Sequence, residues 1–227
     1  MTEAKRWETA LAYANDRLQQ LATIDTLTGL RRGSVRGQAW RSQQCPSRDR
    51  RLVRVDAPST AAPVGVLDEE TVLAFSFGDM LRYSGPGSPA GVALGYQAMR
   101  FALPLLDPDG LLQRREITVH TPFRGPGARD AFELVTRALT EGRYVVDAGL
   151  ERPERGGTLE AFVFRLVYRQ RAVTLLVQEG VVTDEFVSLA RKDPRSDQDE
   201  RHFTELKAGL AEQLVASSPA DVFSLDA

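Results

Sequence analysis

Residues 162–177 constrain the fold more than any other stretch, because apolar and polar side chains alternate on both sides of a short polar turn. The apolar members are Phe162, Phe164, Leu166 and Tyr168 before the turn at residues 169–171, and Val173, Leu175 and Val177 after it. Alternation with a period of two places one face of each strand against a core. The stretch therefore predicts a β-hairpin and, with it, an antiparallel sheet.

The residues around this hairpin predict a mixture of helices and strands. Helices are expected over 67–85, with Asp68, Glu69 and Glu70 in the first turn, over 91–106, ending near Pro104, over 128–142, and over 199–219. Strands are expected over 115–122 and 143–149. This order predicts an α+β fold with a helix–strand–helix–three-strand core, a mainly antiparallel sheet and a C-terminal helix, rather than a doubly wound parallel sheet.

Changes in composition divide the chain into four parts. Residues 1–30 contain an amphipathic helix over 3–22, whose apolar face is Trp7, Leu11, Ala14, Leu18, Leu21 and Ala22. Residues 31–65 are rich in Arg, Ser and Pro without apolar periodicity, which is typical of a basic linker. Residues 66–192 carry the α+β core, and residues 193–227 carry the C-terminal helix and tail.

Charge and cysteine content narrow the class of protein. A net charge of −2 argues against a dedicated nucleic-acid or membrane-surface binder, which needs a clustered basic excess. No apolar run reaches the ~18 residues of a membrane span, and the N-terminus lacks the apolar core of a signal peptide. The single cysteine, Cys45, excludes an internal disulfide. We therefore expect a cytoplasmic protein without nucleic-acid or membrane partners.

Two Gly-Pro-Gly loops, YSGPGSPAG at 83–91 and FRGPGARD at 123–130, each run directly into a predicted helix. Glycines before a helix N-terminus allow a ligand to approach unpaired N–H groups, so a pair of such loops predicts a cleft for a small anionic ligand. The candidate ligand-binding residues are Tyr83, Ser84, Gly85, Gly87, Ser88, Arg124, Gly125, Gly127 and Arg129. The alternative is that both loops are tight turns whose glycines permit close helix packing.

Catalytic and metal-ligating patterns are scarce. Asp130 follows the second loop, where it either caps the helix or points into the cleft, and His120 ends the strand before that loop, where it is either functional or structural. These two are the candidate acid–base residues. His202 is expected on a charged surface, and Asp184 and Glu185 are expected in a turn. Without HxH, CxxC or HExxH spacing, no metal site is predicted, and no cofactor is indicated.

The segments LGYQAM, EITVHTP, RDAFELV and LEAFVFRLVYRQRAVTLLV, in this order over residues 66–192, resemble the core domain of the FmdE family, which is named for one component of formylmethanofuran dehydrogenase. That family places a His- and Cys-containing loop before a GYR-like helix and a Cys-containing loop before a DAIQ-like helix. Here Ser88 and Pro89 stand where the family has Cys-Pro, and FRGPGARD lacks a cysteine. The resemblance implies an accessory or ligand-binding protein for a C1-carrier-like molecule, without the family's metal ligands.

Residues 14–32, ANDRLQQLATIDTLTGLRR, resemble the lead-in of GGDEF diguanylate cyclase domains. No GGDEF motif follows, so this resemblance implies no cyclase activity. The alternative function is therefore a signalling or interaction protein that uses the helix over 3–22 to form a homodimer or to pair with a sensor domain.

Overall fold

The computed structural model describes residues 62–226, which belong to one compact unit. Its helices are α2 (Phe77–Ser84), α3 (Pro89–Leu106), α4 (Pro126–Thr136), α5 (Gly156–Leu159), α6 (Asp184–Arg191), α7 (Asp197–Ala216) and α8 (Pro219–Val222). Its strands are β1 (Val64–Asp68), β2 (Thr71–Phe75), β3 (Ile117–Thr121), β4 (Tyr144–Val146), β5 (Val163–Tyr168), β6 (Arg171–Val177) and β7 (Phe223–Leu225). The helix predicted over 3–22 and most of the predicted linker lie outside the described residues.

Five strands form one sheet in the order β4–β3–β5–β6–β7. The β3–β4 pair is parallel, and the other three pairs are antiparallel. Across the central hairpin, Phe164 lies opposite Leu175 and Leu166 lies opposite Val173, so the alternating apolar residues share one face. The predicted hairpin and the α+β class with a mainly antiparallel sheet are confirmed.

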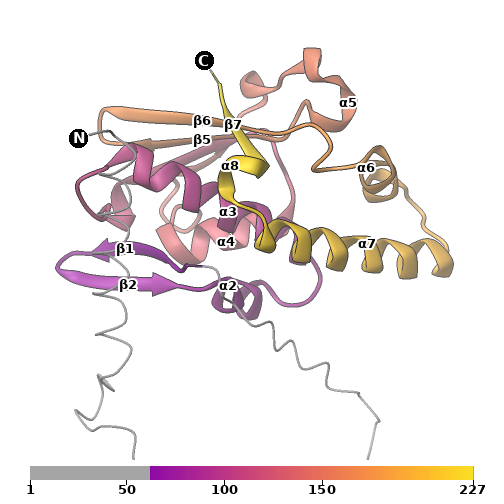
Figure 1. The fold of residues 1–227 in the computed structure, drawn as a ribbon, viewed down its shortest axis with the longest axis horizontal. Helices are drawn as coiled ribbons and strands as arrows, with labels where there is room; N and C mark the ends of the chain where they lie inside the picture. The colour runs from indigo at the N-terminus through magenta and orange to yellow at the C-terminus, as the bar shows by residue number, and fades with distance from the viewer. Residues whose placement is uncertain (1–61, 227) are drawn as a thin grey trace, which may run out of the picture. The chain divides into compact units, whose positions relative to one another are not determined.

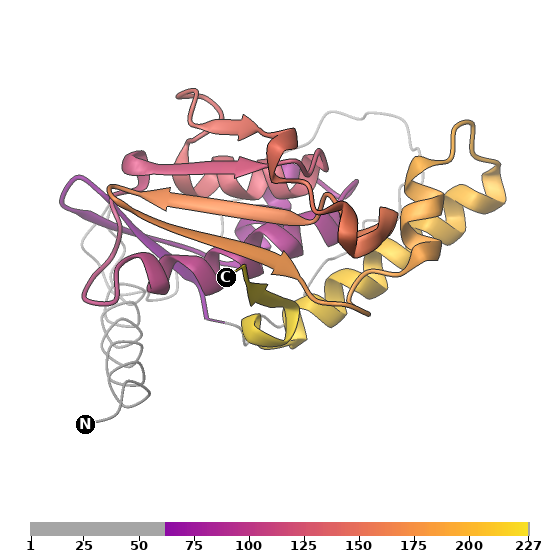
Figure 2. The same ribbon diagram turned by 90° about the horizontal axis from the view of Figure 1, so that it is seen from above.

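Helices α3 and α4 cover the inner face of this sheet, and α7 packs along α3 (Figure 1). Below these helices lie α2 and the separate β1–β2 hairpin, so α3 is enclosed from several sides. Figure 2, seen from above, shows the strands lying over α3 and α4. The side chains of Val92, Tyr96 and Met99 are accordingly fully buried, as a helix with apolar residues all round requires.

The C-terminal end of α4 is fixed by a buried arginine from the 3₁₀ turn η1 (Arg114–Glu116). Arg114 donates from Nε to the Val135 carbonyl at 2.8 Å and from Nη2 to the Leu134 carbonyl at 2.6 Å. Its Nη1 lies 3.4 Å from a carboxylate oxygen of Asp68. Because the last carbonyls of a helix have no partner within it, this cation both pairs them and suits the negative end of the helix dipole.

The helix predicted over 67–85 is wrong in its first half. Residues 64–75 form the β1–β2 hairpin, whose turn holds Glu69 with a φ of 57°, and only residues 77–84 are helical. Acidic residues suit a first helical turn, but here Asp68 pairs with Arg115, at 3.0 Å, and with Arg114. The alternating buried side chains of Val64 and Val66 favour a strand here instead of a helix. This strand begins at Val64, two residues before the predicted start of the core at residue 66.

Two further differences concern the C-terminal quarter. Asp184 and Glu185 are not turn residues, because Thr183 caps α6 and places both acids in its first turn, where they suit the helix dipole. The tail also contains more than the predicted helix. Phe223–Leu225 form β7, which joins the edge of the sheet beside β6 and thereby ties the tail to the core.

Candidate functional site

The two Gly-Pro-Gly loops meet in the structure, because α3 and α4 pack against each other through small residues. A Cβ atom added to Gly127 would overlap the carbonyl oxygen of Ser88 and lie 2.7 Å from the amide nitrogen of Val92. A Cβ atom on Gly95 would lie 2.9 Å from that of Ala131. These two glycines therefore serve close helix packing, which is the alternative that the sequence left open.

The contact shows that α3 and α4 run in the same direction. Gly91 lies against Gly127 and Ala128, and one turn later Gly95 lies against Ala128 and Ala131. Parallel neighbours bring the positive ends of two helix dipoles together. Neither N-cap residue, Ser88 for α3 or Gly125 for α4, supplies a side-chain hydrogen bond to its helix. The two N-termini thus form one electropositive surface without side-chain caps.

Cationic side chains add to this surface. Arg124 and Arg129, both candidate ligand-binding residues, are exposed beside the second loop. Lys207, from the middle of α7, donates from Nζ to the carbonyl of Gly87 at 2.9 Å. No local pattern could have assigned Lys207 to this place, because it lies 120 residues further along the chain and reaches the loop only through the packing of α7 on α3.

Asp130 does not cap α4, whose N-cap residue is Gly125. It is the fifth residue of the helix, and its carboxylate accepts a hydrogen bond from Ser84 Oγ at 2.8 Å and another from Arg129 Nη2 at 3.2 Å. Ser84 ends α2, so the bond ties α2 to α4. The neighbouring Tyr144 has its pKa raised to about 12, mainly because the hydroxyl is buried. It is therefore uncharged near neutral pH.

The remaining candidates are exposed or distant. Tyr83 is 54% exposed at the end of α2, and Gly85 and Gly87 have open space where a side chain would stand. Gly125 differs, because a Cβ there would overlap the ring of Phe123. Gly85 is half-buried and donates its N–H to the Leu81 carbonyl at 2.9 Å, whereas Pro86 and Gly87 are exposed. Residues 86–87 are therefore the part of the first loop that an approaching ligand could reach.

His120 belongs to a different surface. Its neighbours Val119 and Thr121 point to the core, so the alternation of β3 turns His120 to the outer face of the sheet, away from α4. There its Nδ1 lies 4.0 Å from a carboxylate oxygen of Asp147. The structure therefore does not bring His120 and Asp130 together as an acid–base pair.

Comparison with known proteins identifies no family, because no protein-family model and no curated protein matches the chain. The FmdE and GGDEF resemblances rest on the quoted residues. Within residues 62–226, no group of His, Cys, Asp and Glu side chains could hold a metal ion. None of the helices in that range combines the length and hydropathy that a bilayer crossing needs.

Proposed function

We propose that the domain is an accessory or ligand-binding protein that holds a small anionic molecule at the paired N-termini of α3 and α4. The observation that carries the proposal is the parallel contact of two helix N-termini that both lack side-chain caps. Unpaired N–H groups and aligned dipoles favour a negative group at such a place. A bound anion would offset the repulsion between the two positive helix ends.

The ligand would lie on the surface beside the loops, since the helices leave no space between them. Gly85 and Gly87 allow it to approach the backbone, while Arg124 and Arg129 offer guanidinium groups that bind carboxylates or phosphates in forked pairs. Lys207 supplies a further cation next to Gly87. The FmdE resemblance favours a folate- or pterin-like C1 carrier as the anionic molecule.

A thermal-shift screen of the full chain against inorganic phosphate, folates, pterins, nucleotides and divalent metals tests the proposal. We expect a saturable rise in melting temperature with an anionic ligand, because a ligand at about 100 times its Kd stabilises by about 2.7 kcal/mol. The double variant Arg124→Ala/Arg129→Ala should lose most of this response. Arg165→Ala, an exposed arginine on the outer face of the sheet, is the matched control and should keep it.

Two results would overturn the proposal: a response to divalent metals alone, or an equal anion response in the double variant. Amide NMR shifts show whether an anion binds at residues 85–91 and 124–128 or at a different part of the chain. A signalling or interaction role through residues 3–22, with homodimer formation, stays an alternative prediction, because those residues lie outside the described part of the chain. Action in the cytoplasm without nucleic-acid or membrane partners likewise belongs to the proposal.

A further inference from the structure

A groove of about 370 Å³ runs between α7, the start of α6 and the loop that precedes α6. Its apolar lining consists of Val181, Phe186, Leu206 and Leu210. Along α7, Leu206, Gly209, Leu210 and Gln213 line it at helical spacing. Because a Cβ on Gly209 would meet nothing within 4 Å, the helix backbone is open to close approach there.

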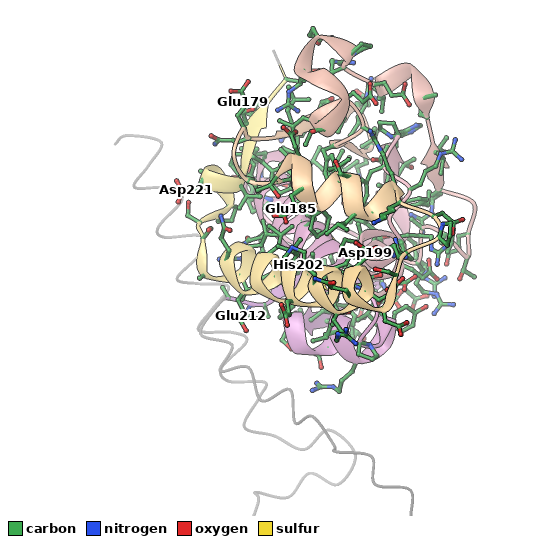
Figure 3. The ribbon with its side chains drawn as sticks, turned by 90° about the vertical axis from the view of Figure 1, so that its right-hand side faces the viewer. Glu179, Glu185, Asp199, His202, Glu212 and Asp221 are labelled. Atoms are coloured by element: carbon green, nitrogen blue, oxygen red, sulfur yellow. The ribbon has the colours of Figure 1, made fainter. Side chains whose placement is uncertain are left out.

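The surroundings of this groove are acidic. Residues 179–226 contain eleven Asp and Glu but five Lys and Arg. Figure 3 shows Glu212 below the C-terminal half of α7 and Glu185 above that helix, whereas Asp221 lies on α8 and Glu179 lies well above α7. Glu205 is itself part of the groove wall. The face therefore combines an apolar floor with carboxylates at its edge.

Part of this acidic charge is balanced by ion pairs, and part is not. Near the start of α7, Asp199 pairs with Lys192 at 2.7 Å and Glu200 pairs with Arg195 at 2.6 Å. In contrast, Glu179, Glu205, Glu212 and Asp221 form no ion pair with any residue in the range 62–226. Of these four, Glu205 lines the groove itself, and Glu179 directly precedes the lining residue Gly180.

We propose that this groove binds a basic amphipathic segment of a partner polypeptide. An apolar floor selects aliphatic side chains, and unpaired carboxylates at the rim select Lys and Arg and disfavour acidic segments. In the helix-in-groove mode, a partner helix would place its own apolar residues, at i, i+3, i+4 and i+7, against this floor. This binding site is separate from the anion surface at the N-termini of α3 and α4.

The test measures the binding of a fluorescent peptide to the full chain by anisotropy. The probe places Leu at helical spacing and Lys elsewhere, and its counterpart carries Glu in place of Lys. We expect the Lys peptide alone to bind, and amide NMR shifts to fall on residues 181–186 and 205–213. Binding should weaken as salt rises from about 0.1 M to about 1 M, since the Debye length falls from ~10 Å to ~3 Å.

Variants test the contribution of the carboxylates and the contribution of the apolar floor separately. Glu205→Gln/Glu212→Gln should weaken the Lys peptide about fivefold, as two exposed charges imply, and Leu206→Ser should weaken it about tenfold. The matched control Glu151→Gln/Glu154→Gln changes two exposed acids elsewhere and should leave binding unchanged.

Equal binding of the Glu peptide, or equal binding by the Glu205→Gln/Glu212→Gln variant, would overturn the proposal. Concentration-dependent mass in sedimentation, with the same NMR shifts on dilution, would instead identify a second copy of this chain as the occupant and would also overturn it.

Discussion

At the scale of single residues, the glycines of this chain have different roles that their sequence context does not reveal. Gly127 lies in a contact where even a methyl group would overlap backbone atoms of α3, whereas Gly209 lies in the open groove. Both are helical, so both lose the same backbone freedom on folding. The difference between them lies entirely in what surrounds the missing side chain.

We predict opposite effects of alanine at these two positions. Gly127→Ala should lower the free energy of unfolding by about 2–3 kcal/mol, because backbone atoms must shift to admit the methyl group. Gly209→Ala should raise it by about 0.5–1 kcal/mol, because alanine restricts the unfolded chain without a clash. Denaturant unfolding of the two variants measures both values, and a change of the same sign in both would contradict the packing described for α3 and α4.

At the scale of elements, α6 and α7 are held together by one polar and one aromatic contact. His202 Nε2 lies 2.8 Å from a carboxylate oxygen of Glu185, and the rings of Phe186 and Phe203 are 5.3 Å apart. The hydrogen bond to Glu185 raises the pKa of His202 above its ordinary value. The pairing of the two helices is therefore linked to protonation near neutral pH.

The sign of this linkage follows from the raised pKa. The stabilisation from the His202–Glu185 pair should be complete below the ordinary histidine pKa of about 6.5 and should disappear as pH rises through the raised value. The difference in melting temperature between the native chain and Glu185→Gln should accordingly be larger at acidic than at alkaline pH. NMR titration of the His202 ring checks the cause, since Glu185→Gln should lower its pKa; an unchanged titration would disprove the pairing.

At the scale of the whole molecule, the C-terminal strand closes the core. Phe223 is 1% exposed and packs edge-on against Phe164, with the ring centroids 5.9 Å apart. Arg152, from the segment beyond β4, pairs with Asp226 and adds a surface contact at the same place. The last residues are thus joined to a hairpin that begins about 60 residues earlier.

Phe223→Ala should destabilise the domain by about 3–4 kcal/mol, as expected for removal of a buried aromatic ring. Leu225→Ala, in the same strand but 52% exposed, is the matched control and should change stability by less than about 0.5 kcal/mol. Both values come from denaturant unfolding. Equal effects would mean that β7 contributes through its backbone pairing with β6 alone.

Much of the fold could be predicted from periodicity, because alternation and helical spacing record which side of each element is buried. The β5–β6 hairpin and the helices α3, α4 and α7 follow in this way. The β1–β2 hairpin does not, because three consecutive acids suit a helix start, while the left-handed turn at Glu69 depends on strand pairing. Strand β7 does not either, because three residues are too few to show a pattern.

The sequence alone determined that glycine-rich loops precede α3 and α4, since composition and spacing are local properties. Only the tertiary structure decided what those glycines face. Gly127 packs against the first turn of α3, while a side chain at Gly85 or Gly87 would have no neighbour within 4 Å. Lys207 of α7 binds the carbonyl of Gly87. The physical reason is that the sequence shows only that a glycine has no side chain. Whether that absence permits close packing or leaves open space depends on which atoms from distant parts of the chain lie next to it.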